Sequence, residues 1–285
     1  MKYTLFFRIF LVALFLGQPI AKSQSVTVHD IATKMFAQSK GIRTLNYTMK
    51  KLERIKGKLI MQQSTVKLNM NPLKVYLYQD APKKGLEVLY VQGTNNNHAI
   101  VNTNGFPWVS LNLDPYGSTM RENQHHTLLN SGYDHVIGIL EFLFTKYQSE
   151  IHDMVKMDGS VVWDKHNCWA VTLTNKQFKY VSYKVLKGEN VISIANKFRL
   201  SEHMILEKNP SIDSYTDVKE GQVIVIPCDY SNKMTLYIDK LRYIPLVMKV
   251  YDDQGLYEQY EYTNVTVNGP IKAEEFTRDY GDYNF

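Results

Sequence analysis

The spacing of apolar and polar residues predicts a series of short strands that begins after one amphipathic helix. Apolar residues recur on one face of residues 27–38, which is typical of such a helix. From residue 45 onward the pattern changes to short, imperfectly alternating apolar stretches separated by turn residues. We expect strands at 45–55, 58–68, 74–78, 86–91, 99–102 and 109–113. Because no helix separates these strands, they favour an antiparallel, meander-like sheet.

The second half of the chain repeats this pattern around one strongly apolar helix. Residues 134–147 carry apolar side chains on almost every side, which is typical of a buried helix. The turn at 252–255 predicts a hairpin. Further strands are expected at 161–163, 168–174, 178–185, 235–241, 246–251 and 256–262. The pattern as a whole predicts an α+β fold.

The first 23 residues are predicted to be a secretory signal peptide rather than part of the fold. Lys2 and Arg8 accompany a short apolar run that ends at Gly17, and small residues occupy the two cleavage positions, Ala21 and Ser23. The run is shorter than the about 20 apolar residues that a membrane span requires. No cysteine follows the run as a site for a lipid anchor. We therefore expect secretion across the inner membrane to the periplasm or cell envelope, without a membrane-spanning segment.

Charge and cysteine content exclude several classes of function. The chain has 33 Lys and Arg residues against 28 Asp and Glu residues, a net charge of +5. Removal of residues 1–23 deletes three basic residues and no acidic one, so the net charge falls to +2. This small charge gives no general attraction to nucleic acid, and no nucleic-acid partner is expected. Two cysteines are too few for a disulfide scaffold or a four-cysteine zinc site.

The sequence indicates no catalytic residue, no metal ligand and no cofactor. It lacks the motifs of serine hydrolases, zinc proteases, phosphate-binding loops and CxxC redox sites. The densest polar cluster includes His125 and His126, but adjacent histidines point apart, whereas helical metal sites favour i,i+4 spacing. A surface or hydrogen-bonding role is therefore expected for both. The neighbours Glu53 and Arg54 face opposite sides of a strand. Other carboxylates show no acid–base arrangement; they include Asp239, Asp252, Asp253 and Glu258.

Residues 183–227 form a separate unit with a strand–helix–helix–strand pattern. A strand at 183–186 and a turn at Gly188 precede a helix with an apolar face, and Ser201 caps a second helix. The unit closely resembles the LysM domain. That family's motifs YxVxxGDxLxxIAxxF, LxxxNP and GQxLxIP are present here as YKVLKGENVISIANKF, ILEKNP and GQVIVIP. The resemblance covers the whole module.

The LysM resemblance implies that N-acetylglucosamine polymers such as peptidoglycan bind in a shallow groove between two loops. The implied contacts are Gly188, Glu189, Asn190, Val191 and Ile192 in the first loop, and Asn209, Pro210, Ser211 and Ile212 in the second. Amides can bond the acetamido group, and apolar side chains can pack on its methyl group. An equally weighted alternative makes Asn209 a helix cap and turn residue. The usual Asp-Thr is replaced by Glu189-Asn190, which leaves open a different glycan or none.

The remaining residues, 24–182 plus 228–285, are predicted to form one β-rich domain that the LysM unit at 183–227 interrupts at a hairpin tip. Its stretches LERIKGKLIMQQSTVKLNMNPLKVYLY, KKGLEVLYVQG and GFPWVSLNLDPYGSTMR resemble the DUF1571 family of unknown function. The tail LYIDKLRYIPLVMKVYDDQGLYEQYEYTNVTVN is similar to it and to the wider LolA/LolB-like lipoprotein-carrier fold. The resemblance implies an antiparallel, half-open β-barrel packed on helices. It also implies an apolar cavity for a lipid or lipoprotein, with a plain apolar core as the alternative.

Cys168 and Cys228 flank the LysM unit and would lie in an oxidising compartment. A disulfide between them would close a loop of about 60 residues and stabilise the fold by about 2–4 kcal/mol. Two separate buried thiols are the alternative. The sequence leaves both arrangements open.

Together these inferences predict a non-enzymatic, secreted cell-envelope protein that binds peptidoglycan or another N-acetylglucosamine polymer through its LysM insert. One alternative is a lipid or lipoprotein carrier that uses an apolar cavity in the main domain. A third is a wall hydrolase that uses the insert for targeting.

Overall fold

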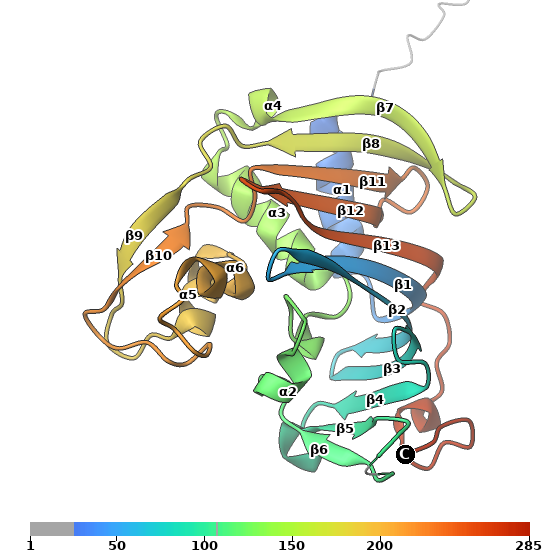
Figure 1. Ribbon diagram of the computed structural model, residues 1–285. Helices are drawn as coiled ribbons and strands as arrows, with labels where there is room; N and C mark the ends of the chain where they lie inside the picture. The colour runs from blue at the N-terminus through green and yellow to red at the C-terminus, as the bar shows by residue number, and fades with distance from the viewer. Residues whose placement is uncertain (1–25, 107) are drawn as a thin grey trace, which may run out of the picture.

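The computed structural model describes residues 26–106 and 108–285, and the predicted signal peptide lies outside them. One 11-stranded antiparallel sheet dominates the fold, with the strand order β6-β5-β4-β3-β2-β1-β13-β12-β11-β8-β7 (Figure 1). Its strands are β1 Thr44–Ile55, β2 Lys58–Met70, β3 Leu73–Ala81, β4 Leu86–Val91, β5 Ala99–Asn102, β6 Leu111–Leu113, β7 Val155–Trp163, β8 His166–Thr174, β11 Lys233–Asp239, β12 Pro245–Asp252 and β13 Gly255–Val267.

The sheet confirms the predicted α+β class with a half-open antiparallel sheet. Strands β1 to β6 pair with their neighbours in sequence, as a meander does, and β1 also pairs with β13. The β1–β13 pair joins the two halves of the chain into one curved layer, of which β6 and β7 are the edges in the described part of the chain. The sheet is therefore not closed into a barrel.

Several strands differ from their predicted ends, and two of these differences, in β6 and β7, have a clear cause. Strand β6 starts at Leu111 instead of residue 109, because Trp108 adopts a positive φ of 59° and its N–H donates to the carbonyl of Gly105 in a turn. Strand β7 starts at Val155 instead of residue 161. Its residues are mostly exposed at the edge of the sheet, so its first half carries no apolar pattern that a sequence analysis could detect.

Two helices pack on the concave face of the sheet, α1 at Val28–Lys40 and α3 at Asp134–Lys146. They meet edge to face through Phe36 and Phe144, and their buried residues belong to the same core as the sheet. Short helices are α2 at Ser118–Arg121 and α4 at Ile151–Met154, and 3-10 turns lie at Asn95–Asn97, Leu128–Asn130 and Ala273–Phe276. Among the described residues, no helix has the length and apolar character needed to cross a bilayer.

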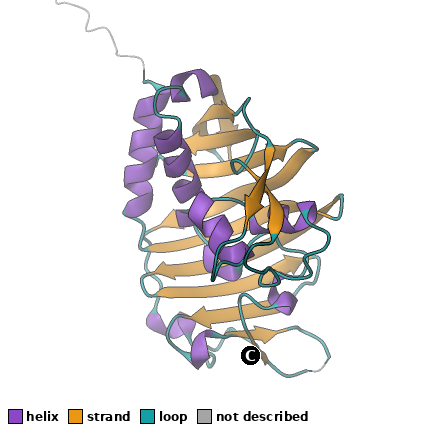
Figure 2. Ribbon diagram, turned by 90° about the vertical axis from the view of Figure 1, so that its left-hand side faces the viewer, coloured by secondary structure: helices purple, strands orange, loops and turns teal. Residues whose placement is uncertain are grey.

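The C-terminal segment covers part of the opposite face of the sheet. Tyr283 stacks on Tyr76 of β3 with ring centroids 3.7 Å apart, and Lys67 of β2 pairs with Glu275 at 2.6 Å. Phe276 is buried in one cluster with Tyr76 of β3 and Leu89 of β4. The helices α1 and α3 and the insert lie on the other, concave side of the sheet (Figure 2).

The LysM unit has its own small sheet and its own core. It comprises β9 at Tyr180–Lys184, α5 at Val191–Phe198, α6 at Glu202–Lys208 and β10 at Val223–Pro227, with β9 and β10 paired antiparallel. The unit leaves the main sheet after β8 and returns at β11. These two strands are neighbours, with Thr174 opposite Lys233, so the insert takes the place of a hairpin turn.

The insert also docks onto the main domain. Met204 of α6 is 0% exposed and packs in the main-domain core, not in the core of the insert. Ser201 Oγ lies 2.9 Å from the hydroxyl of Tyr257 on β13. The guanidinium of Arg121 forms an ion pair with Glu202 and lies 3.4 Å from the ring centroid of Tyr215. These contacts fix α6 beside the open side of the sheet (Figure 1).

The two cysteines are separate free thiols, so the disulfide alternative is wrong. Cys168 lies opposite Asp239 near the start of β8, whereas the N–H of Cys228 bonds to Lys179 O, beyond the other end of that strand. The remainder of β8 separates the two positions by about 20 Å at the rise of a strand. A disulfide requires Cα atoms within about 7 Å.

Candidate functional site

The two loops expected to bind a glycan lie side by side in the LysM unit. Gly188 forms a turn with a φ of +79°, which a residue with a side chain adopts only with strain. The N–H of Val191 then donates to the carbonyl of Tyr215 at 3.0 Å, which ties the first loop to the segment after the second. Val191 and Ile212 share one apolar core.

The residues that depart from the LysM motif are held by internal hydrogen bonds. The carboxylate of Glu189 accepts from the Tyr183 hydroxyl at 2.7 Å, the Leu186 N–H at 3.0 Å and Lys197 Nζ at 3.0 Å. Desolvation raises the pKa of Glu189, but these hydrogen bonds outweigh it and lower the pKa below its usual value. Asn190 caps α5 by accepting from the N–H of Ser193 at 2.8 Å. Glu189 and Asn190 therefore stabilise the conformation of the loop.

Three of the nine expected contact residues have buried side chains. Val191 is 0% exposed, Ile212 6% and Asn209 8%. The Asn209 amide donates to the carbonyls of Ile205 and Val225 and accepts from the N–H of Val225, so its hydrogen-bonding capacity is largely used within the module. This supports the structural alternative for Asn209 and places the side chains of Val191 and Ile212 in the core.

The remaining loop residues reach the surface to different degrees. Gly188, Pro210 and Ser211 are exposed, and Ile192 at the start of α5 is half-buried. These residues offer a small apolar surface and a hydroxyl group, which is the combination that an acetamido sugar can use.

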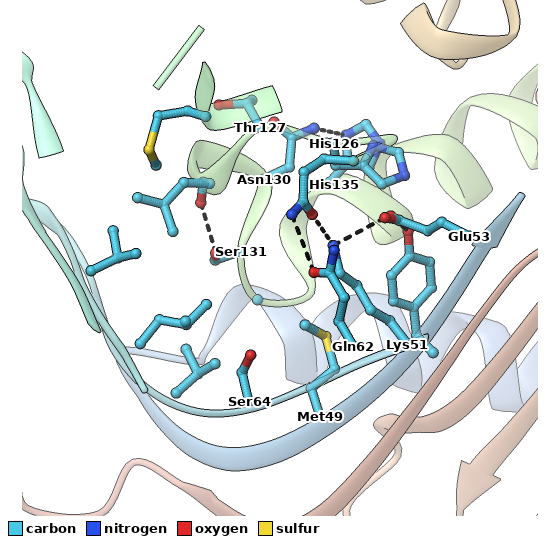
Figure 3. Close-up of a pocket in the computed structure, with 18 of the residues that line it drawn as sticks. Met49, Lys51, Glu53, Gln62, Ser64, His126, Thr127, Asn130, Ser131 and His135 are labelled. Carbon is cyan, nitrogen blue, oxygen red and sulfur yellow. Dashed lines mark hydrogen bonds and ion pairs between the residues drawn. The ribbon is translucent and has the colours of Figure 1, made fainter. Parts of the chain in front are cut away.

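A second candidate site is a cavity of about 350 Å³ on the concave face of the main sheet (Figure 3). Most of its wall is apolar and comes from strands β1 to β6 and β11 to β13 and from α3; it includes Val66, Leu77, Val88, Val101, Val136 and Met248. One end of the cavity is polar. There Lys51 and Glu53 of β1 lie with Gln62 of β2 and with His126 from the loop before α3.

The polar end of the cavity is built around two buried carboxylates. Glu53 of β1 and Glu258 of β13 are directly opposite in the strand register, and both are almost fully buried. Glu53 accepts from Tyr260 Oη at 2.6 Å and from Lys51 Nζ at 3.0 Å. Glu258 accepts from Tyr230 Oη at 2.6 Å.

Two histidines complete this group. Nε2 of His126 lies 3.2 Å from Oε2 of Glu258 and 3.1 Å from the hydroxyl of Tyr230. His125 is 1% exposed, and its two ring nitrogens face a carboxylate of Glu258 at 2.9 Å and the carbonyl of Arg54 at 3.0 Å. Since both partners are acceptors, both nitrogens donate and the ring is a cation. His125 is therefore hydrogen-bonded as predicted, but it is not on the surface.

The ionisation of these groups follows from their neighbours. Burial raises the pKa of Glu53, but the charges of Lys51, His125 and His126 overcome it and lower the pKa to about 2. Burial likewise opposes ionisation of Glu258, and His126 and His125 hold its pKa well below the usual value. Burial lowers the pKa of His125, but its bond to Glu258 prevails and raises it. The two carboxylates thus lie among the basic side chains of Lys51, His125 and His126.

A third histidine, His135 of α3, lies beside this group and remains neutral. Its ring centroid is 4.8 Å from that of His126, and burial is the main cause that lowers its pKa to about 3. Nδ1 of His135 lies 2.8 Å from Asn130 Nδ2, while its buried Nε2 has no hydrogen-bond partner among the described residues.

Comparisons with known proteins identify both parts of the chain. The model of the family described as "Protein of unknown function (DUF1571)" matches residues 42–187, about half of the chain. The LysM domain model matches residues 183–227. Both predicted family resemblances are confirmed by these matches. No curated protein sequence matches the chain.

Solved structures with a similar arrangement share little sequence with the chain. The Mycobacterium tuberculosis lipoprotein LppX is 13% identical, with a TM-score of 0.40 over 86% of this chain and 99% of that chain. A LolA superfamily protein from Nitrosomonas europaea is 10% identical, with a TM-score of 0.34 over 90% and 100% of the two chains. The Pseudomonas aeruginosa MucA/MucB complex is 9% identical, with a TM-score of 0.40 over 87% of this chain. This chain covers 59% of the length of the matched chain in one MucB structure and 60% in another.

Proposed function

Because this chain belongs to the DUF1571 family and carries a LysM domain, we propose that it is a non-enzymatic, secreted cell-envelope protein that binds peptidoglycan or another N-acetylglucosamine polymer. The LysM match carries the proposal, because it spans a complete strand–helix–helix–strand module. The proposed division is a LysM domain at 183–227 and a split main domain at 24–182 plus 228–285. The signal peptide at 1–23 directs the protein to the periplasm or envelope.

The proposed glycan groove lies between the loops at 188–192 and 209–212. Ile192 and Pro210 supply its apolar surface for the acetamido methyl group, and the Ser211 hydroxyl supplies a hydrogen bond. Gly188, Glu189 and Asn190 shape one side, and Asn209 together with the buried Val191 and Ile212 supports both. One module presents a small contact area, so we expect weak binding that repeats along the wall strengthen.

Replacing Ser211 with arginine is expected to weaken binding of the mature protein to insoluble peptidoglycan by about tenfold. The long side chain would occupy the groove, while its exposed position leaves the fold intact. Co-sedimentation with purified peptidoglycan measures the bound fraction, and chitin oligomers are expected to compete.

The matched control is Ser182→Arg, the same change at an exposed position on β9. Equal binding by the two variants would contradict the proposed groove. Release of soluble glycan fragments from the peptidoglycan would contradict the non-enzymatic assignment and favour a wall hydrolase.

The cavity supports a second function, the binding of a lipid or the acyl chain of a lipoprotein. Its volume of about 350 Å³ and its mostly apolar wall suit an acyl chain, and its polar end suits the head of an amphiphile. The glycan-binding and carrier functions use different parts of the chain and are compatible.

Replacing Ser64 with phenylalanine is expected to lower the affinity for a fluorescent fatty acid by about tenfold or more. Ser64 lies on the cavity wall in β2, so the larger ring would fill space that the acyl chain needs. Fluorescence titration of delipidated protein measures the affinity. The control is Thr65→Phe, the next residue of the strand, which faces the opposite side. Undiminished binding by Ser64→Phe would contradict a ligand in this cavity.

A further inference from the structure

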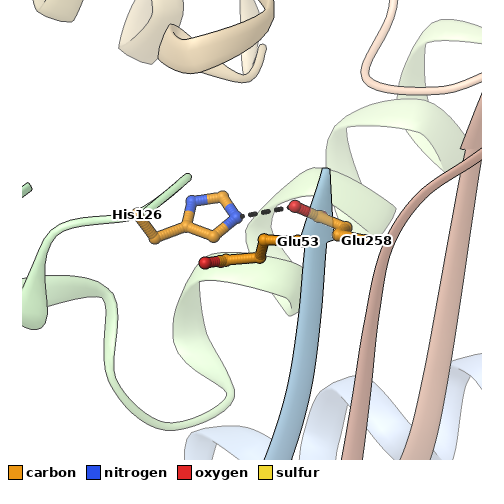
Figure 4. Close-up of side chains that lie close together, drawn as sticks. All are labelled: Glu53, His126 and Glu258. Carbon is orange, nitrogen blue, oxygen red and sulfur yellow. Dashed lines mark hydrogen bonds and ion pairs between the residues drawn. The ribbon is translucent and has the colours of Figure 1, made fainter. Parts of the chain in front are cut away.

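We propose that Glu53, Glu258 and His126 form a binding site for a divalent transition metal, of which Zn²⁺ is the representative, at the polar end of the cavity. Each residue offers one donor atom, and the three atoms lie within 4.8 Å of one another (Figure 4). One nitrogen and two carboxylate oxygens are donors that Zn²⁺ accepts, whereas Ca²⁺ and Mg²⁺ favour oxygen alone. The site is independent of the proposed glycan groove.

The strand register explains why a cation fits between the two carboxylates. Glu53 and Glu258 are a cross-strand pair on adjacent strands, and both point toward the concave face. Like charges in such a pair repel each other, and burial makes the repulsion stronger. A metal ion between the carboxylates removes this repulsion.

The surrounding side chains hold the three donors in place as the outer contacts of a metal site do. Tyr260 donates to Oε1 of Glu53 at 2.6 Å, and Tyr230 donates to Oε1 of Glu258 at 2.6 Å. Nδ1 of His125 donates to Oε2 of Glu258 at 2.9 Å. Hydrogen bonds of this kind fix the orientation of ligating carboxylates.

A further nitrogen donor and open space adjoin the three residues. Nε2 of His135 is buried and has no hydrogen-bond partner among the described residues, and its ring lies 4.8 Å from that of His126. His135 also lines the same cavity (Figure 3). The cavity thus gives the ion a path of entry and a position for a water or a ligand atom.

Lys51 pairs with one carboxylate oxygen of Glu53 when no metal is bound. Its Nζ lies 3.0 Å from Oε2 of Glu53, and its side chain is 12% exposed on the cavity wall. Together with His125 it balances the two carboxylates. A metal ion that binds Oε2 of Glu53 must displace the ammonium group of Lys51, which makes this lysine a competitor of the metal.

This competition can be tested with a variant that is expected to bind the metal more tightly than the wild type does. Zn²⁺ alone is titrated into the untagged, chelator-treated mature chain by calorimetry, and retained zinc is measured after dialysis. We expect one ion per chain. Lys51→Met is expected to bind Zn²⁺ about tenfold more tightly, because a competing positive charge is gone, and His126→Gln is expected to lose about tenfold or more.

His29→Gln is the matched control, because His29 is an exposed histidine of α1, remote from the cavity. Circular dichroism checks the fold of each variant, and an unfolded Lys51→Met could not imitate a gain in affinity. Absence of stoichiometric zinc in both the wild type and Lys51→Met would overturn the site. Zinc uptake that His126→Gln leaves unchanged would overturn it as well.

Discussion

Replacing Arg54 with methionine is expected to lower the free energy of unfolding by about 3–5 kcal/mol. The guanidinium of Arg54 pairs with both carboxylate oxygens of Asp252 and donates to the carbonyl of Leu256 at 3.3 Å. Both charged side chains are buried. Methionine fills similar space but leaves the carboxylate of Asp252 buried without a cation. Urea denaturation followed by circular dichroism measures the loss.

Two further variants separate the ion pair from general effects of the substitution. The double variant Arg54→Met/Asp252→Asn is expected to be more stable than Arg54→Met alone, because no uncompensated charge remains. Asparagine also keeps an acceptor for the N–H of Gln254, which bonds to Oδ1 of Asp252 at 2.8 Å. Lys156→Met breaks the exposed pair with Asp158 and is expected to cost less than about 1 kcal/mol. An Arg54→Met cost no larger than that of Lys156→Met would contradict the prediction.

The sequence predicts the parts of the fold that depend on short stretches of chain. Strands β1 to β5 lie close to the expected ranges, because apolar and polar residues alternate along each strand and a turn residue follows it. The LysM unit was predicted from motifs within 45 consecutive residues, and its two helices and two strands are present. The apolar residues of α3 predicted its burial, which the core confirms.

The cavity cluster could not be predicted, because its members meet only through long-range pairing. Glu53 and Glu258 are 205 positions apart in the sequence and become opposite neighbours only when β1 pairs with β13. His126 reaches them from an irregular loop before α3. A strand pattern shows which face a residue occupies but not which strand lies beside it, so no sequence signal places these groups together. The pairing of Arg54 with Asp252 has the same origin.

The docking of the insert on the main domain is a second long-range feature, and the LysM motif does not predict it. A LysM motif predicts the internal packing of the module, and Ile194 and Ala195 follow it. Met204 lies in the same module and is also apolar, but its side chain packs in the main-domain core. The pattern of apolar residues identifies all three residues as buried. It does not show whether a residue packs in the core of the insert or in the core of the main domain.

Replacing Met204 with alanine is expected to destabilise the main domain by about 2–5 kcal/mol, although the residue belongs to the insert. Its side chain is 0% exposed within the main-domain core, and truncation leaves a cavity there. The three tryptophans are Trp108, Trp163 and Trp169, and all lie outside residues 183–227. Tryptophan fluorescence during urea denaturation therefore follows the main domain and should show the loss.

The control is Ile194→Ala, which truncates an equally buried residue in the core of the insert. It is expected to unfold the module at lower urea, seen by circular dichroism, with a smaller shift in the tryptophan transition. The contrast would show that α6 contributes to the stability of the main domain, so that removal of residues 183–227 takes away more than the proposed glycan groove. A Met204→Ala variant whose tryptophan transition matches the wild type would contradict this coupling. The insert would then be a tethered module, and its deletion would be a clean test of wall binding.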